Sequence, residues 1–526
     1  MDSFCGKLLT SIFILPFTAG HTRRQRNGSW YYDCTITSRV LFLIVLAIVI
    51  VFTASKGIHT QAEDRLGIVV ILLSLFLVSA MTGIYILGYI VRRNGVESVV
   101  NSRRNSASQK LQVIFLWGFG LASGLYCALF VGKQIECFVT STDGFYWRAL
   151  FCFNIFLIIC LFSEMIFITY FSSFVLKHTL LVNYITFLIL TTNTSVIFYI
   201  YIMHDTLSYL QEISPEDQFL SCLQNNSTVT VFKVKVKQLL NQTSVEYSLL
   251  SITIVLEIWS PTTKNNPESD RSYPRHVESS DTDIVETMPL LDDVTSTSPS
   301  KSGNRSKRTV CQMVTLAVSL TTGIGLVVCY IMMATDIGNT ETVRLVTEMY
   351  SFILKCIMTL ALFSGFFCLI NYCSPNGSPT GLKLREYVYL LSAFGIFIAH
   401  TSKMIAGDLS SDYLAKLVLS ESVCGMFQDY LQVVFLLCAN RCRKFYPRSN
   451  VNLLESVLIF IMVCNFILWV NDSFLLPEFT STRIMKQGDL PKEISLIEYD
   501  LLLPVSVFFR FTSFMEYHAT FDKFTM

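Results

Sequence analysis

The chain has 526 residues, of which 52% are hydrophobic and only 15% are charged. Soluble domains carry about 25% charged residues, so this much apolar surface cannot be hidden in a water-soluble core. The formal net charge of +1 also excludes the strong positive field that recruits nucleic acid, which leaves an integral membrane protein.

The apolar runs are long enough to cross a bilayer as helices, which takes about 20 residues each. Six runs precede the middle of the chain, at Ser38 to Ser55, Gly67 to Val91, Leu111 to Val131, Phe145 to Phe171, Leu180 to Met203 and Ser244 to Trp259. Six more follow, at Thr309 to Ala334, Val343 to Asn371, Glu386 to Ile405, Leu414 to Leu437, Val451 to Val470 and Ile494 to Met515. We therefore predict an all-α membrane protein with about twelve transmembrane helices in two six-helix halves.

A polar stretch separates the two halves. It is rich in Ser, Thr, Asp and Pro with hardly any aromatic residue, so it cannot bury enough apolar surface to fold. The predicted divisions are an N-terminal segment 1–37, a first half 38–261, a linker 262–308 and a second half 309–521. Within the linker, Glu286 to Leu291 reads ETMPLL, which matches a sorting signal for an endosomal or lysosomal pool and also arises readily by chance.

Basic residues set the predicted orientation, because cytoplasmic loops carry the excess of Lys and Arg. They collect before the first helix, after the second and after the tenth, at Arg23, Arg24, Arg26, Arg92, Arg93, Arg103, Arg104, Arg441, Arg443, Lys444 and Arg448. Both termini and the linker are thus predicted in the cytoplasm. The segment between the fifth and sixth helices then faces outward with sequons at Asn225, Asn226 and Asn241.

Cys137 and Cys222 fall in predicted outer loops, where an oxidising compartment would permit a disulfide between them.

The two halves show an internal repeat. EYSLL begins at Glu246 in the sixth helix, and EYDLL begins at Glu498 in the twelfth, so Tyr247 corresponds to Tyr499. Further matches pair Glu164 with Gln432, three places before a Phe, and pair mid-helix Asn193 with Asn465. Each of these Asn residues is followed toward the outer end by an acid, Asp205 and Asp472 respectively.

At these residues the sequence resembles the otopetrins, a family of proton-conducting channels with twelve helices in two halves. The resemblance is carried by VEYSLLSITIVLEIW from Val245, CNFILWVNDSF from Cys464 and PVSVFFRFTS from Pro504, and more weakly by TTN at Thr191 and LQVVFLL at Leu431. It covers the chain from about residue 110 onward. The sequence departs from the family pattern at Glu164, Leu188 and Thr512, where the family has Gln, His and His.

The resemblance implies a polar triad in each half that passes protons without a wide pore. Residue by residue, these positions are Glu164, Asn193, Tyr247, Gln432 and Asn465, and the internal repeat adds Tyr499. Glu164 would place a titratable carboxyl at a constriction. The alternative is that these side chains only hold helices together through hydrogen bonds worth about 0.6 kcal/mol each. The resemblance also implies a homodimer in the plasma membrane, with protons and membrane lipid as partners and sterol as one candidate lipid.

Further ionisable residues lie in or near the predicted spans, where a charge costs about 2.5 to 3.5 kcal/mol and so indicates a function. The supporting set is Asp205, Glu246, His400, Asp472, Glu498 and Arg510. Arg510 is too far along its own helix from Glu498 or Asp500 to pair with either, at about 15 to 18 Å. We expect it either to reach the cytoplasmic interface or to bind another helix, and we expect His400 near an outer helix end, as a structural residue or an external pH sensor.

Other functions fit less well. No nucleotide-binding glycine loop, HExxH or GxSxG motif is present, and no cysteine spacing is typical of a metal site, so we predict no enzyme, cofactor or metal. A secondary transporter of two six-helix halves is the main competitor, and a non-conducting relative is another. A multi-helix chemosensory receptor would instead have seven helices without a repeat.

Overall fold

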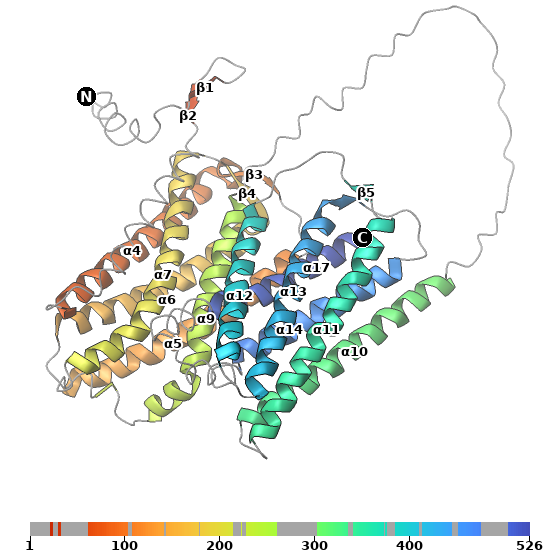
Figure 1. Ribbon diagram of the computed structural model, residues 1–526. Coiled ribbons are helices and arrows are strands. Elements are labelled where there is room, and N and C mark those ends of the chain that lie inside the picture. Colours follow the sequence, from red (N-terminus) through yellow and green to blue (C-terminus); the bar gives the residue numbers. More distant parts are fainter. Residues whose placement is uncertain are drawn as a thin grey trace, which may run out of the picture.

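A computed structural model describes most of the chain (Figure 1). The described residues are 22–24, 30–32, 62–103, 108–140, 144–177, 179–213, 222–223, 228–259, 302–334, 340–372, 374–375, 384–409, 413–443, 451–474 and 503–525. The predicted first helix, Ser38 to Ser55, and most of the linker lie outside these residues.

The described part contains eleven long α-helices. The first half holds α4 (Ala62–Asn94), α5 (Ser108–Thr140), α6 (Phe145–Phe171), α7 (Leu180–Ile213) and α9 (Thr228–Ile258). The second half holds α10 (Ser302–Ala334), α11 (Thr340–Tyr372), α12 (Leu384–Leu409), α13 (Tyr413–Arg441), α14 (Val451–Phe474) and α17 (Leu503–Thr525). Residues 302–308, predicted as linker, belong to α10, and α9 begins well before the predicted Ser244.

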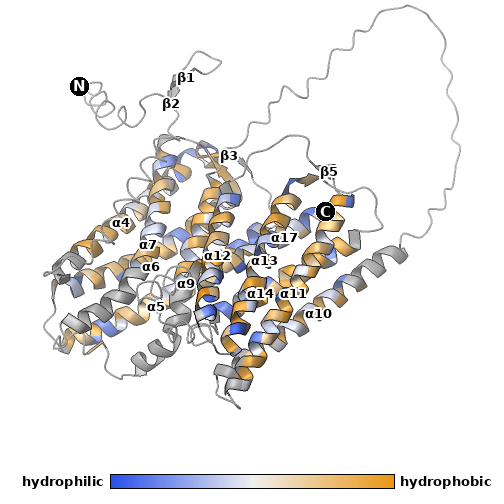
Figure 2. Ribbon diagram, in the orientation of Figure 1, coloured by the Kyte–Doolittle hydropathy of each residue, from blue (hydrophilic) through white to orange (hydrophobic). Residues whose placement is uncertain are grey.

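Nine of the described helices are long and apolar enough to cross a membrane, and α9 and α17 are not among them. Large apolar side chains cover the exterior, for example Tyr85, which is 74% exposed on α4, and Ile370, which is 79% exposed on α11. Figure 2 shows hydrophobic residues along most of the helices. A helix buried among others needs no apolar outer face, and residues 243–248 of α9 and 506–513 of α17 are all buried. The protein is therefore an all-α, multi-pass membrane protein.

The same helix packing occurs twice along the chain. In the first half α4 packs on α6 and α7, α5 packs on α6 and α9, and α9 also packs on α6 and α7. In the second half α11 packs on α13 and α14, α12 packs on α13 and α17, and α17 also packs on α13 and α14. Such a match is what an internal repeat produces.

Three short antiparallel strand pairs accompany the helices. β3 (Val100–Arg103) pairs with β4 (Phe174–Leu176), and these strands follow α4 and α6. β5 (Ser374–Pro375) pairs with β6 (Cys442–Arg443), and these follow the corresponding α11 and α13. The third pair, β1 (Thr22–Arg24) with β2 (Trp30–Tyr32), precedes the helices. Figure 1 shows β3, β4 and β5 at one end of the bundle.

Aromatic rings join the two halves. Phe115 and Phe119 of α5 meet Phe511 of α17 with ring centroids 5.0 and 5.4 Å apart, and both also meet Trp469 of α14 at 5.8 Å. Edge-on contacts of this kind stabilise a buried interface beyond the area that they cover. The halves therefore pack partly through aromatic side chains.

Cys137 and Cys222 form a disulfide, as the sequence allowed. Cys137 lies inside α5 rather than in a loop and is fully buried. The predicted loop position was wrong because α5 continues nine residues beyond Val131, where the predicted apolar run stops, to Thr140.

Candidate functional site

A buried carboxyl lies among hydroxyl and amide groups inside the first half. Glu164 on α6 is 4% exposed. It accepts hydrogen bonds from Asn193 Nδ2 of α7 at 2.5 Å, from Tyr247 OH of α9 at 3.4 Å and from Ser251 Oγ of α9. Three different helices therefore supply one polar cluster, which we call the Glu164 cluster and which comprises these four residues.

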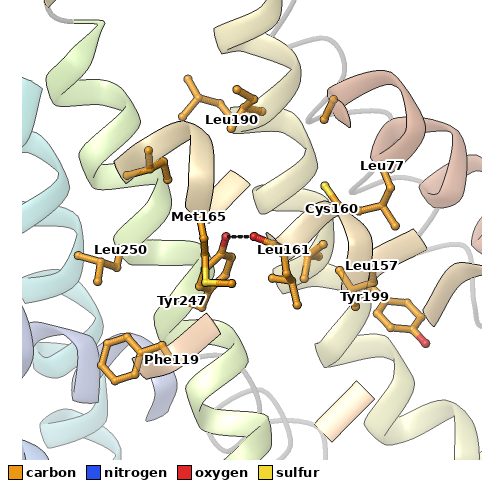
Figure 3. Close-up of a cluster of buried hydrophobic side chains, with 14 of the residues drawn as sticks. Leu77, Phe119, Leu157, Cys160, Leu161, Met165, Leu190, Tyr199, Tyr247 and Leu250 are labelled. Atoms are coloured by element: carbon orange, nitrogen blue, oxygen red, sulfur yellow. Dashed lines mark hydrogen bonds between the residues drawn. The ribbon is translucent and has the colours of Figure 1, made fainter. Parts of the chain in front are cut away.

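The groups around the Glu164 cluster are apolar. Figure 3 shows Tyr247 facing Leu161, with Met165 beside its ring and Cys160 nearby. The Tyr247 hydroxyl lies 3.3 Å from the Leu161 carbonyl oxygen. Gly120 of α5 makes room for the ring, because a Cβ there would lie 3.0 Å from Tyr247 Cε2 and 2.3 Å from Met165 Sδ.

The structure brings together Glu164, Asn193 and Tyr247, the three first-half residues chosen from the sequence, and it adds Ser251. Ser251 follows Tyr247 by four residues, so both side chains leave the same face of α9. That spacing is visible in the sequence and could have indicated it. Asn193 also donates to the Ile189 carbonyl at 3.0 Å, which fixes its amide within α7.

The second half repeats the central bond with an uncharged pair. Gln432 Nε2 of α13 donates to Asn465 Oδ1 of α14 at 3.1 Å, and Asn465 Nδ2 donates back to Gln432 Oε1 at 3.2 Å. Asn465 also bonds to the Ile461 carbonyl at 2.9 Å, just as Asn193 bonds four residues back. Gln428, which the sequence analysis missed, donates to Gln432 at 2.7 Å.

Charged groups adjoin this second-half pair. Arg510 of α17 binds Asp429 of α13 through two bonds of 2.5 and 3.0 Å, and its Nη1 reaches Gln428 Oε1 at 3.4 Å. His400 Nε2 of α12 lies 3.1 Å from Asp429 Oδ2, the oxygen that Arg510 Nη2 also binds. Arg510 is 2% exposed and His400 is 3% exposed.

The structure shows where Arg510 and His400 lie. Arg510 binds another helix and does not extend to the interface, because Asp429 offers it a matched carboxylate in the interior. His400 is a buried residue of α12 and lies nine residues before the end of that helix. Its Nε2 contacts Asp429 within the bundle.

A second ion pair lies beside His400. Lys355 of α11 pairs with Glu421 of α13, and Ser351 donates to the same carboxylate at 3.0 Å. Gly425 of α13 leaves room for both groups, because a Cβ there would lie 3.0 Å from both Lys355 Nζ and His400 Nε2. We call Lys355, Glu421, His400, Asp429 and Arg510 the charged cluster.

The remaining predicted residues are dispersed. Glu246 of α9 accepts from Trp469 Nε1 at 2.8 Å and from Ser473 Oγ at 3.0 Å, so it connects the halves rather than joining the Glu164 cluster. Asp472 is half-buried on α14. Asp205 and Asn241 lie within α7 and α9, although their side chains are outside the described ones, so Asn241 is not in a loop. Four predicted positions lie outside the described residues, namely Asn225, Asn226, Glu498 and Tyr499.

The chemistry available is proton exchange along hydrogen bonds. Glu164 can accept and release a proton, and its hydroxyl and amide neighbours can both donate and accept hydrogen bonds. Within the described part of the chain no group of three or more His, Cys, Asp or Glu could hold a metal ion.

Comparison with known proteins agrees with this fold. The profile of the family described as Otopetrin matches residues 202–511, which is more than half of the chain. The match begins in α7, later than the expected residue 110, and it includes Tyr247, Gln432 and Asn465 but not Glu164 or Asn193. A search among curated proteins found no matching relative. By this match and its helical membrane fold, the chain belongs to the otopetrin family, a family of membrane channels.

Proposed function

We propose that this protein is a proton-selective channel that conducts H⁺ down its gradient in response to extracellular acid. The observation that carries the proposal is the Glu164 cluster, a buried carboxyl bonded to Asn193, Tyr247 and Ser251 from two other helices. Protons can cross such a cluster by exchange between hydrogen-bonded groups, whereas larger hydrated ions need a wide pore.

In the second half, Gln432 and Asn465 correspond to Glu164 and Asn193 of the first half. They would form the constriction of the second half, and Tyr499 would take the role of Tyr247. We propose that the two halves are an internal duplication, because their helix packing repeats. The predicted boundaries are 38–261 and 309–521, and α10 extends the second half back to Ser302. Supporting roles would belong to Glu246, His400, Arg510 and Asp472. Asp205 and Glu498 join this set because the internal repeat pairs them with Asp472 and Glu246.

The cellular setting follows from the same family. We propose a homodimer in the plasma membrane with both termini in the cytoplasm, in contact with lipid and with sterol as one candidate. Glycans would mark the outer segment at Asn225 and Asn226 first, since Asn241 lies within α9. Glycosidase should increase the mobility of the native chain on a gel, and replacing the three Asn by Gln should remove that shift.

The function is tested by whole-cell recording with intracellular pH imaging during external acid steps. We expect opposite effects on the current from two substitutions of Glu164. Glu164→Gln keeps a group that can bond to Asn193 and Ser251, so it should retain current but change its dependence on pH. Glu164→Leu removes the group and should lower the current about tenfold, which corresponds to about 1.4 kcal/mol on the barrier.

Surface biotinylation serves as the control for both variants. If acid steps evoke neither current nor cytoplasmic acidification in cells that carry the wild-type protein at their surface, the channel proposal is wrong. If current flows but substitutions at Glu164 and Tyr247 leave it unchanged, the assignment of the Glu164 cluster is wrong.

A proton-coupled secondary transporter is the second candidate, and one observation favours it. The charged cluster holds two buried ion pairs, Lys355 with Glu421 and Arg510 with Asp429, and buried ionisable pairs mark coupling sites in transporters. The distinguishing measurement is flux in vesicles that contain only buffer and salt. A channel passes protons there, whereas a transporter requires its second solute.

A further inference from the structure

Two thiols from different helices meet in the second half. Cys356 of α11 and Cys424 of α13 lie with their sulfur atoms 3.5 Å apart. A disulfide bond has a length of about 2.05 Å, so the two sulfurs need to approach by only about 1.5 Å. Both cysteines are unbonded in this structure.

The thiol pair borders the lipid-facing surface. Both cysteines are half-buried. Their neighbours one or three residues away are large apolar side chains that point outward, with Ile353 50%, Ile357 43%, Val423 50% and Phe427 48% exposed. Both helices are candidate membrane spans, over Leu345–Asn371 and Tyr413–Arg441, and neither cysteine is near the end of its span. The compounds that reach this pair most readily are therefore those that dissolve in the bilayer.

We propose that Cys356 and Cys424 form a dithiol modification site that reduces lipid hydroperoxides and is itself oxidised to a disulfide. In this step one thiol sulfur attacks the peroxide, whose O–O bond breaks, and the second thiol then displaces the oxygen from the first sulfur. The two S–H bonds break and one S–S bond forms. The hydroperoxide takes up the two electrons and two protons from the thiols and leaves as one alcohol and one water.

The disulfide ties together the two helices that hold the Lys355–Glu421 ion pair. Cys356 follows Lys355 directly, and Cys424 lies three residues after Glu421 on α13. A covalent bond at this point therefore limits separation of α11 from α13. Glutathione and other polar reductants partition poorly into an apolar bilayer, so the bond should persist once it forms.

The test uses the full-length protein in liposomes treated with a fatty-acid hydroperoxide. Remaining thiols are blocked with N-ethylmaleimide, and the non-reduced digest is analysed by mass spectrometry. We expect a peptide in which Cys356 is joined to Cys424, lost in Cys424→Ser and retained in the control Cys152→Ser, since Cys152 is an exposed cysteine of the first half. An excess of bonds between separate chains, or equal oxidation of Cys152, would contradict the proposal.

A second probe does not depend on an oxidant. Phenylarsine oxide is lipid-permeable and binds two neighbouring thiols through one arsenic atom. One adduct that bridges the two cysteine-containing peptides should form on the wild type and should be absent in both Cys356→Ser and Cys424→Ser. If no bridging adduct forms on the wild type, the two thiols do not act as a pair. Proton flux is not a readout here, so failure of this proposal leaves the channel proposal unaffected.

Discussion

The two polar clusters occupy corresponding helices but differ in charge. Around Glu164 the described partners are an amide and two hydroxyls, all of them uncharged. In the second half the corresponding residue is neutral Gln432. The Arg510–Asp429 pair adjoins it through Gln428, and the Lys355–Glu421 pair lies farther along α13, next to His400. Glu164 can therefore exchange a proton without leaving a buried counter-ion, whereas protonating Asp429 would leave Arg510 uncompensated.

This difference predicts that the two halves contribute unequally to proton exchange. A buried charge that loses its partner is strongly unfavourable, at about 3–5 kcal/mol, so the charged cluster should keep its ionisation fixed and act mainly in holding helices together. The Glu164 cluster has no such constraint. The Asn bond to the carbonyl four residues back is present in both halves, and we propose that the first half contributes more to proton exchange than the second.

The largest expected effect comes from removing one charge of the second half. Asp429→Asn leaves Arg510 buried with no carboxylate and should destabilise the fold by about 3–5 kcal/mol. Thermal unfolding of the purified protein in detergent measures this loss. The control is Asp408→Asn, which alters a pair with Lys416 at 3.5 Å whose Asp side chain is 80% exposed, and it should leave unfolding unchanged. If both variants lose the same stability, the buried charge pair of Asp429 and Arg510 is not important for the fold.

A second prediction sharpens the comparison from the first half. In Gly120→Ala the new Cβ would crowd Tyr247 and Met165, so this variant should lose about 1–3 kcal/mol of stability and some proton flux. Gly118→Ala is the matched control, because no atom lies within 4 Å of a Cβ there. If both variants behave alike in unfolding and flux assays, close packing around Tyr247 is not important.

The smallest expected effect lies between the halves. Trp469→Phe keeps an aromatic ring at the interface but removes the indole N–H that binds Glu246 at 2.8 Å. A single interhelical hydrogen bond in a membrane contributes about 0.6 kcal/mol, so unfolding should shift slightly and flux should stay near wild type. Trp117→Phe, which removes a bond to Thr169 within the first half, is the comparison. A large loss of flux in Trp469→Phe alone would place the path between the halves.

The sequence predicted the helices best where polar residues are isolated within a long apolar run. The bounds of α6 agree with prediction, because apolar residues continue on both sides of Arg148, Asn154 and Glu164 as far as Phe171. By contrast α9 was predicted sixteen residues too short at its start, since Lys233, Lys235 and Lys237 interrupt the apolar pattern. Hydropathy describes lipid-facing helices well and helices buried in protein poorly.

The candidate site was predicted in part. Repeat matching named Glu164, Asn193 and Tyr247, which the fold brings into contact. The ion pair of Asp429 with Arg510 joins residues 81 positions apart, and whether they meet depends on how α13 and α17 are rotated about their axes. Sequence spacing within one helix could only exclude partners for Arg510 and could not identify this one.

The most direct test of the unequal halves compares two matched substitutions. Asn193→Leu breaks the bond to Glu164, and Asn465→Leu breaks the corresponding bond to Gln432. Acid-evoked current, normalised to surface protein, should fall about tenfold in Asn193→Leu, equivalent to about 1.4 kcal/mol, and should fall less in Asn465→Leu. Equal losses, or a larger loss in Asn465→Leu, would contradict the assignment of proton exchange to the Glu164 cluster.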